Sequence, residues 1–320
     1  MDKNAKIYVA GHNGMVGSAI YRKFKNENFQ NLIVKSRNEL DLTNQSAVYD
    51  FFESNKPEAV IIAAAKVGGI IANSTYPVEF LYNNIMIQNN LINASKEFGV
   101  QKLIFLGSSC VYPKFSDQPI KEEYLLTGAL EPTNEAYSIA KISGIKMCQS
   151  FHHQFGCNFY SLMPTNLYGE NDYFNLRNSH VIPALLYKMH LAKLNNNEFV
   201  EIWGTGKPTR EFLFVDDLAN AVFFAFTNIN ANDVYSLGIS QLNIGTGVEI
   251  SISELAETIK EVVGYNGKLK YNTDNPDGMP KRLLDVSKIE KMGWKHTTNL
   301  KNGLEKTYQW FIDNINNLRV

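Results

Sequence analysis

Strand-like and helix-like stretches alternate through the first half of the chain, and this alternation limits the possible folds more than any other feature. The strand-like stretches are short and continuously apolar. Apolar strands joined by helices are typical of a parallel sheet that is covered on both faces. The sequence therefore predicts an α/β protein with a doubly wound parallel sheet and a ligand site at the carboxyl ends of the strands. The expected strands lie at 6–10, 32–34, 59–63, 102–106 and 158–162, and the expected helices at 15–25, 44–54, 77–98 and 134–155.

The alternation stops after Pro164, where a polar and aromatic segment covers 168–178. The rest of the chain mixes expected helices with short strands. We therefore expect a first domain over residues 1–165 and a smaller, mixed C-terminal lobe over residues 166–320. No low-complexity tether lies between them, so segments near 204–245 are expected to return to the first domain. The expected helices of this part lie at 251–263, 287–292 and 299–314, and the expected strands at 199–203 and 241–244.

Composition excludes several classes of protein. The chain of 320 residues carries 31 Lys and Arg against 32 Asp and Glu, which excludes a strongly basic nucleic-acid binder as the default. Its three cysteines form no C-x-x-C pair, so we expect neither a disulfide framework nor a metal site. The N-terminus lacks the apolar core of a secretory signal, and no apolar run has the length of a membrane span. We expect a soluble, cytoplasmic protein with no membrane or nucleic-acid partner.

A glycine-rich turn follows the first expected strand. Gly11, Gly14 and Gly17 are spaced as G-x-x-G-x-x-G and lead into the first expected helix. Glycines in such a turn let backbone amides approach a pyrophosphate at the helix N-terminus. In this strand–turn–helix context, the pattern predicts a Rossmann-type dinucleotide site rather than a merely tight turn. Arg37, with Lys35 near it after the second strand, favours the 2′-phosphate of NADP over NAD. The alternative is an ordinary solvated loop cation.

A second motif places Tyr137 and Lys141 four residues apart, on one face of an expected helix. An ammonium beside a phenol lowers the pKa of that phenol, which can then exchange a proton with a substrate oxygen. Ser108 follows the fourth expected strand and could hold the same oxygen. A surface tyrosine stacked on a lysine stem is the usual alternative. After a glycine-turn dinucleotide fold, the pattern predicts that Tyr137 is an acid/base residue.

With these motifs, the chain resembles the extended short-chain dehydrogenase/reductase family. The resemblance spans nearly the whole chain and is greatest to the family's 3,5-epimerase-4-reductases. The matching motifs are long and occur in the same order. They lie at 11–19, 63–70, 106–113, 131–135, 163–169, 178–184, 204–217 and 276–286.

The resemblance implies NADPH-dependent conversion of GDP-4-keto-6-deoxy-D-mannose to GDP-L-fucose, by 3,5-epimerisation and reduction of the C4 ketone. That ketone acidifies the hydrogens on C3 and C5, so a base and an acid can invert both carbons through an enolate. The family assigns the base to the position of Cys110 and the acid to that of His180, which suit these tasks. Tyr137 would protonate the C4 oxygen and Ser108 would orient it. Lys141 would hold the nicotinamide ribose and tune Tyr137.

The resemblance also implies two sets of binding residues and a homodimer that packs through helices 77–98 and 134–155. The cofactor set is Gly11, Asn13, Gly14, Met15, Val16, Gly17, Arg37, Asp41, Leu42, Ala63, Ala64, Ala65, Leu106, Gly107, Ser109, Lys141, Pro164, Asn166, Leu167 and His180. The GDP-sugar set is Ser108, Ser109, Asn134, Tyr137, Asn166, His180, Val181, Lys188, Trp203, Arg210, Asp277 and Arg282.

Several alternatives remain open from the sequence. A C4 reductase without epimerisation, acting on a related GDP-4-keto-6-deoxy sugar such as a heptose, is the main one. A non-catalytic NADP-binding sensor, a dehydratase and a 4-epimerase are further ones. Asn13 and Lys188 stand where some family members carry Arg, which bears on cofactor preference and substrate detail. Taken alone, Cys110 could be a small buried residue, His180 a residue at a helix start, Trp203 part of the core and Arg210 the partner of Glu211 or Asp216.

Overall fold

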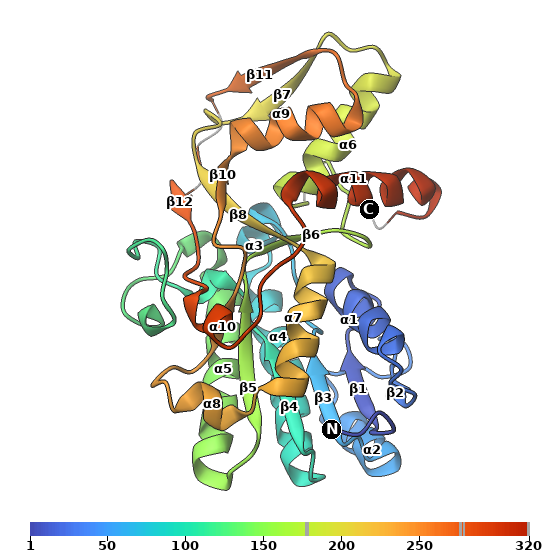
Figure 1. Cartoon of the computed structure of the whole chain (residues 1–320), viewed down its shortest axis with the longest axis vertical. Coiled ribbons are helices and arrows are strands. Elements are labelled where there is room, and N and C mark those ends of the chain that lie inside the picture. Colours follow the sequence, from blue (N-terminus) through green and yellow to red (C-terminus); the bar gives the residue numbers. More distant parts are fainter. Residues whose placement is uncertain (177–178, 275–276, 278, 319–320) are drawn as a thin grey trace.

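The computed structural model of the chain describes residues 1–176, 179–274, 277 and 279–318 (Figure 1). Its central element is a six-stranded sheet in which every pair of neighbouring strands is parallel. This arrangement confirms the doubly wound sheet. In spatial order the strands are β2 (Leu32–Ile33), β1 (Ile7–Ala10), β3 (Ala59–Ile62), β4 (Lys102–Leu106), β5 (Phe159–Pro164) and β9 (Leu242–Ile244).

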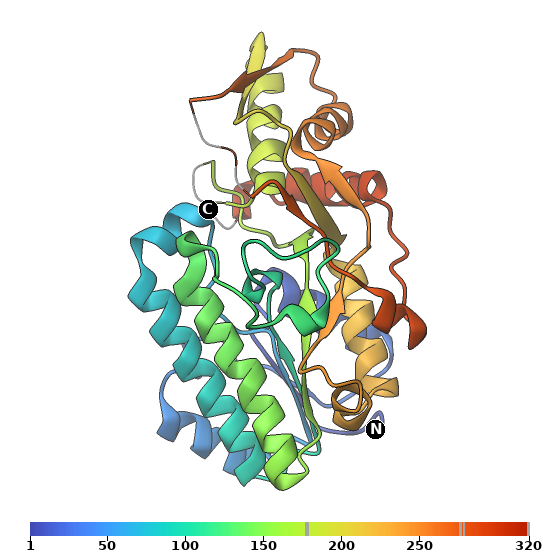
Figure 2. The same cartoon turned by 90° about the vertical axis from the view of Figure 1, so that its left-hand side faces the viewer.

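Helices cover both faces of this sheet, which explains why its inner strands are apolar at almost every position. Strands β1, β3, β4 and β5 are buried along their whole length. Figure 2 shows one face covered by α2 (Gln45–Asn55), α4 (Pro77–Glu97) and α5 (Glu135–Phe155), with α4 and α5 packed side by side. The other face carries α1 (Met15–Asn26) and α7 (Val215–Asn228).

A second group of elements lies beyond the carboxyl ends of the sheet (Figure 1). Its small sheet is built on β8 (Thr209–Phe214), which pairs with β6 (Asn166–Tyr168), β10 (Glu249–Ser251) and β12 (Lys281–Arg282). A separate parallel pair joins β7 (Phe199–Trp203) to β11 (Lys268–Asn272). Three helices pack around these strands: α6 (Val181–Leu194), α9 (Ile252–Val263) and α11 (Leu300–Asp313).

Short elements complete the described chain. The remaining α-helices are α3 (Ile70–Thr75), α8 (Ala231–Tyr235) and α10 (Ser287–Lys291). The 3-10 turns are η1 (Ser109–Val111), η2 (Glu122–Tyr124), η3 (Pro132–Asn134) and η4 (Ile315–Asn317). No helix among the described residues is long and apolar enough to cross a membrane.

The described residues form two hydrophobic cores, and the chain passes between them more than once. The larger core contains the central sheet and also side chains of α7, β9 and α10, which come late in the sequence. The smaller core contains side chains of α6, α9 and α11, together with Phe212 and Phe214 of β8. Strand β8 therefore connects the two, because Leu213 points into the larger core. The predicted division near residue 165 stays a prediction.

Candidate active site

The glycine turn joins β1 to α1 and has no room for side chains at two of its glycines. Gly11 has a φ of +89°, and a Cβ atom there would lie 2.7 Å from the backbone of Ala64. A Cβ atom on Gly17 would lie 2.1 Å from the carbonyl oxygen of Gly11. Gly14 is the N-cap of α1 and provides no capping side chain. The N-terminus of α1 is therefore shaped to offer its backbone N–H groups to an anion.

Most of the other predicted cofactor residues lie at or just after the carboxyl ends of strands, whereas Lys141 lies on α5 and His180 begins α6. Parallel strands place their carboxyl ends along one edge of a sheet, so the fold brings these residues to the same edge. In this set, Arg37, Asp41 and Leu42 follow β2, Ala63–Ala65 follow β3, Leu106 ends β4 and leads into Gly107 and Ser109, Pro164 ends β5, and Asn166 and Leu167 belong to β6.

The loop after β2 carries two cations, Lys35 and Arg37, and one of them is already held in an ion pair. Glu39 accepts hydrogen bonds from the backbone N–H and the hydroxyl of Ser36, at 2.8 and 2.6 Å, which lower the pKa of Glu39 to about 2. Lys35 forms an ion pair with Glu39 at 3.5 Å. Arg37 forms no ion pair within the described part of the chain. Arg37 is therefore better placed than Lys35 to meet a 2′-phosphate.

Tyr137 and Lys141 lie on successive turns of α5, beside the end of β4. The Nζ atom of Lys141 lies 5.8 Å from the centroid of the Tyr137 ring and donates a 2.8 Å hydrogen bond to the carbonyl of Leu106. Burial lowers the pKa of Lys141 to about 8. Burial also raises the pKa of Tyr137, so the expected lowering of that pKa is wrong here. The cause is desolvation of the phenol, and Cys110 raises the pKa further, while the ammonium of Lys141 is bonded to the carbonyl of Leu106.

Cys110 lies in η1, immediately after β4, and is 8% exposed. Burial lowers the pKa of Lys141 and of Arg282, and the nearby Cys110 opposes that lowering in both residues. Burial raises the pKa of Tyr137, and the nearby Cys110 raises it further. Tyr137, Lys141 and Arg282 therefore all lie close enough to Cys110 for its charge to act on them. We call these four residues the group around Cys110.

Hydrogen bonds from two directions hold the backbone around Cys110. The hydroxyl of Ser138 donates to the carbonyl of Cys110 at 3.0 Å, and Arg282 donates through Nη1 to the carbonyl of Ser109 at 3.0 Å. Asn134 accepts a 3.4 Å hydrogen bond from the same Ser138 hydroxyl. Ser108 precedes η1 and is half-buried. The turn that carries Ser108 and Cys110 is thus fixed between α5 and β12.

His180 is the N-cap of α6, and Val181 is the first residue of that helix. The side chain of His180 is exposed to solvent, yet the surrounding protein lowers its pKa by desolvation. Among the described residues, no hydrogen bond or ring contact joins His180 to Cys110 or Tyr137. Within the described part of the chain, the structure therefore does not link His180 to the group around Cys110.

Lys188 and Trp203 form a pair further along α6. The Nζ atom of Lys188 lies 4.9 Å from the centroid of the Trp203 ring. Trp203 ends β7 and is 48% exposed, which rules out a place in the core. An exposed aromatic ring beside an ammonium suits a ligand contact.

Arg210 on β8 lies near Arg282 and Asp277. Burial and the charge of Arg282 lower the pKa of Arg210, and Asp277 opposes this. Arg210 donates through Nη1 to the carbonyls of Thr209 and Met279, at 2.7 and 2.6 Å. Two neighbouring guanidinium groups suit a diphosphate.

The contacts around Arg210 and Arg282 show what holds Asp277 and whether Arg210 forms an ion pair with Asp216 or Glu211. Both oxygens of Asp277 are engaged by Thr205, through its backbone N–H at 2.8 Å and its hydroxyl at 2.7 Å. The alternative of an ion pair between Arg210 and Asp216 fails, because Asp216 pairs with Arg22 at 3.0 Å. Glu211 makes no ion pair with Arg210 either.

Glu211 positions other parts of the site, and the sequence analysis did not predict this role. It is fully buried, and its carboxylate accepts backbone N–H bonds from Thr246 at 2.5 Å, Gly247 at 2.8 Å and Leu284 at 3.0 Å. Its own carbonyl accepts a 2.9 Å bond from the side chain of Asn166. Glu211 therefore ties β8 to the turn after β9 and to the segment after β12.

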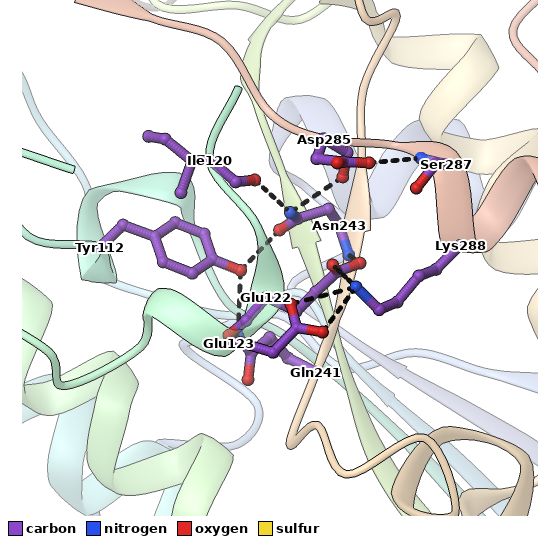
Figure 3. A network of polar contacts seen from close by, with 9 residues as sticks. All are labelled: Tyr112, Ile120, Glu122, Glu123, Gln241, Asn243, Asp285, Ser287 and Lys288. Carbon is purple, nitrogen blue, oxygen red and sulfur yellow. Dashed lines mark hydrogen bonds and ion pairs between the residues drawn. The ribbon is translucent and has the colours of Figure 1, made fainter. Parts of the chain in front are cut away.

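A buried polar network, also missed, connects the segment after Cys110 to the segment after Arg282 (Figure 3). Asn243 on β9 donates to the carbonyls of Ile120 and Asp285, at 3.0 and 3.1 Å. Glu122 is buried, which raises its pKa, and it forms an ion pair with Lys288 at 2.9 Å. No sequence spacing indicates these contacts, because they join residues 42 to 166 positions apart.

A doubly wound parallel sheet with a glycine turn after its first strand, and a Tyr–Lys pair beside its fourth, defines the class of Rossmann-type nucleotide-cofactor enzymes. Residues 7–238 match the model of the NAD dependent epimerase/dehydratase family. The chain belongs to that family.

Named relatives cover nearly the whole chain. GDP-L-fucose synthase 1 of Arabidopsis thaliana is 55% identical over 316 residues, covering 99% of this chain and 96% of that one. GDP-L-fucose synthase of Escherichia coli K12 is 49% identical, covering 98% of each chain. Among solved structures, a GDP-D-glycero-L-gluco-heptose synthase of Campylobacter jejuni, determined in the presence of NADPH, is 41% identical with a TM-score of 0.92, over 98% of this chain and 99% of that one.

Proposed function

We propose that this chain converts GDP-4-keto-6-deoxy-D-mannose to GDP-L-fucose with NADPH, by epimerisation at C3 and C5 and reduction at C4. Relatives that are named for this product and are 49–55% identical over almost the full length support the proposal. The observation that carries it is the position of Cys110 against Tyr137 and Lys141, because a base for epimerisation and an acid for reduction then share one site.

The chain's residues fit a dinucleotide. The glycine turn leaves a cradle that Cβ atoms on Gly11 and Gly17 would fill, and Arg37 is the cation for a 2′-phosphate. Lys141 would hold the nicotinamide ribose next to Tyr137. When bound, NADPH supplies the hydride that reduces the C4 ketone.

Epimerisation needs one group that removes a proton and another that returns it on the opposite face. Cys110 would remove the hydrogen from C3 and then from C5, since the ketone makes both acidic. Lys141 and Arg282 supply positive charge beside this thiol, the environment in which cysteine side chains act as bases. His180 would return each proton, because an imidazole can donate near neutral pH.

Reduction needs a proton for the C4 oxygen. The raised pKa of Tyr137 keeps its phenol protonated at neutral pH, which suits a proton donor. Lys141 is held by the carbonyl of Leu106 and would favour the phenolate that remains after transfer. Ser108 would orient the C4 oxygen from the other side.

The test uses GDP-4-keto-6-deoxy-D-mannose and NADPH in heavy water. NADPH absorbance reports reduction, and deuterium at C3 and C5 of the product reports epimerisation. We expect NADPH consumption with deuterium at both carbons and GDP-L-fucose as the product. No NADPH consumption with this substrate would contradict the proposal.

A second candidate is a C4 reductase that acts on a related GDP-4-keto sugar without epimerisation. The 41% identical heptose synthase of Campylobacter jejuni, with its TM-score of 0.92, supports it. In the same experiment, this candidate predicts NADPH consumption without deuterium. A GDP-4-keto-heptose would then be the better substrate by kcat/KM.

We extend the proposal to a homodimer in the cytoplasm. Large apolar side chains are exposed along α4 and α5, including Val78 (75% exposed), Tyr82 (59%) and Ile139 (45%), and a second copy would cover them. Sedimentation equilibrium measures the assembly directly, and a monomer at micromolar concentration would contradict it. Cys110, Cys148 and Cys157 are all free, which fits a reducing compartment.

A further inference from the structure

Arg282 reaches the turn of Cys110 from a strand that lies far from it in the sequence. Its Nη1 atom donates to the carbonyl of Ser109 at 3.0 Å, and the residue is buried. The same carbonyl accepts a 3.3 Å hydrogen bond from the backbone N–H of Tyr112, which closes the turn. Arg282 ends β12, a strand of two residues. So short a strand fixes a long side chain poorly, and the position of Arg282 therefore depends on how the segment after it is held.

The segment after Arg282 pairs with the segment that precedes η2. The backbone N–H of Ile120 donates to the carbonyl of Leu283 at 2.7 Å, and the backbone N–H of Asp285 donates to the carbonyl of Ile120 at 2.8 Å. Gln118 adds a side-chain contact, because its Oε1 atom accepts a 2.8 Å hydrogen bond from the backbone N–H of Leu283. Leu283 directly follows Arg282, so Gln118 holds the backbone next to the point from which the guanidinium extends.

Asn243 holds the same two segments together from the central sheet (Figure 3). Its Nδ2 atom donates to the carbonyls of Ile120 and Asp285, at 3.0 and 3.1 Å. Its Oδ1 atom accepts a 2.6 Å hydrogen bond from the hydroxyl of Tyr112, which directly follows η1. The side chain is fully buried, and its amide group and its oxygen are both engaged. Asn243 therefore joins the chain after η1 to the chain after β12.

An asparagine suits this place because its side chain offers two donors and an acceptor without a charge. Two carbonyls and a hydroxyl face it, and buried polar groups without partners are costly. A leucine of similar size would leave all three without their asparagine partner. The two segments would then lose the contact that joins them from β9, and Arg282 would lose its fixed position beside Cys110.

We propose that Gln118 and Asn243 are positioning residues for the epimerisation. They hold the segment after Arg282 against the segment after Cys110, and so keep the guanidinium beside the thiol that removes the hydrogens from C3 and C5. Neither residue belongs to the predicted cofactor set or the predicted GDP-sugar set. This inference rests on the proposed function, because it takes Cys110 as the base.

The test follows deuterium from heavy water into C3 and C5 of GDP-4-keto-6-deoxy-D-mannose, on the full chain saturated with NADP⁺, which cannot reduce the ketone. Gln118 is half-buried, so Gln118→Ala removes its contact without emptying a core. We expect this variant to exchange about twofold to tenfold more slowly, the effect of one net hydrogen bond. Gln118→Glu keeps an acceptor oxygen for the Leu283 N–H and should exchange at close to the wild-type rate. Asn243→Leu should exchange at least about tenfold more slowly, because it removes three hydrogen bonds.

Alkylation of Cys110 by iodoacetamide separates a loss of positioning from a general loosening. The reaction needs the thiolate, which neighbouring positive charge favours. Gln118→Ala and Asn243→Leu should therefore slow the alkylation at neutral pH, measured by mass spectrometry of the Cys110 peptide. A structure that was merely looser would expose the buried thiol and speed its alkylation, and that result would overturn the proposal.

Lys102→Met is the matched control. Lys102 is also a buried donor to two carbonyls, those of Phe226 and Ile229 at 2.7 and 2.8 Å, but it begins β4, at the opposite end of that strand from Cys110. This variant should keep the wild-type rates of exchange and alkylation. Equal losses in Lys102→Met and Asn243→Leu, or wild-type exchange in Gln118→Ala and Asn243→Leu, would overturn the positioning role and leave the proposed function intact. No deuterium exchange by the wild-type protein would instead overturn the proposed function, and this inference with it.

Discussion

Replacing Glu211 by Gln tests whether one buried carboxylate holds the two cores together. Its Oε1 atom accepts from the backbone N–H groups of Thr246 and Gly247, and its Oε2 atom accepts from that of Leu284. A glutamine has the same shape but only one acceptor oxygen. With that oxygen toward Thr246 and Gly247, its amide faces the Leu284 N–H. Glu211→Gln therefore loses one charge-assisted bond and leaves two buried donors without acceptors.

The magnitude follows from two opposing effects. A buried donor without an acceptor costs about 1–3 kcal/mol, so two donors cost about 2–6 kcal/mol. Removing the buried charge offsets part of this cost in free energy. Burial raises the pKa of Glu211, which shows that the anion is disfavoured there. We expect Glu211→Gln to lower the free energy of unfolding by about 2–4 kcal/mol, the lower half of the donor range.

Urea unfolding followed by circular dichroism measures this loss, and Glu249→Gln is the matched control. Glu249 lies directly opposite Glu211 on β10, but it is partly exposed and pairs with Lys281. A surface pair of this kind contributes about 0–1 kcal/mol. If Glu211→Gln were no less stable than Glu249→Gln, the three backbone bonds would not hold the cores together, and the argument would fail.

Four further predictions concern the reaction. Tyr137→Phe should abolish NADPH oxidation while NADP⁺ still binds by calorimetry, and wild-type turnover would remove Tyr137 as the proton donor. Cys110→Ala should reduce deuterium incorporation at C3 and C5 far more than NADPH oxidation of an already epimerised substrate; an equal loss of both would make its role structural. Arg37→Ala should raise the KM for NADPH about tenfold or more, and that for NADH little, as expected for one lost charged contact. The lowered pKa of Lys141, about 8, means that its ammonium is lost as pH rises through 8, so kcat/KM should fall above pH 8. Lys141→Arg keeps its charge and should shift that fall to higher pH; an unchanged profile would assign the fall to another group.

The predictable part of the fold follows from local pattern. Strand β4 and strand β7 have the expected bounds, and α1, α2, α4 and α5 begin and end within about one residue of expectation. Continuous apolar strands and the glycine turn depend on nearby residues only, so the chain's own pattern is sufficient. The same pattern did not indicate α6, whose residues are apolar around most of the helix and therefore lack a clear period.

Local pattern could also be misleading about electrostatics. The spacing of Tyr137 and Lys141 placed both side chains on one face of α5, as the structure has them. It did not indicate the direction of the Tyr137 pKa, because that depends on how deeply the phenol is buried and on the carbonyl of Leu106, which holds the ammonium. Neither fact is local to the motif.

By itself, the sequence determined the parallel sheet, the turn for a dinucleotide, and the residue types at the strand ends, because each depends on spacing along a few residues. Only the tertiary structure decided how Arg282 reaches the carbonyl of Ser109 and how Glu211 holds the turn after β9. These contacts join segments far apart in the chain. Their partners are selected by packing and burial, which no local pattern of residues encodes.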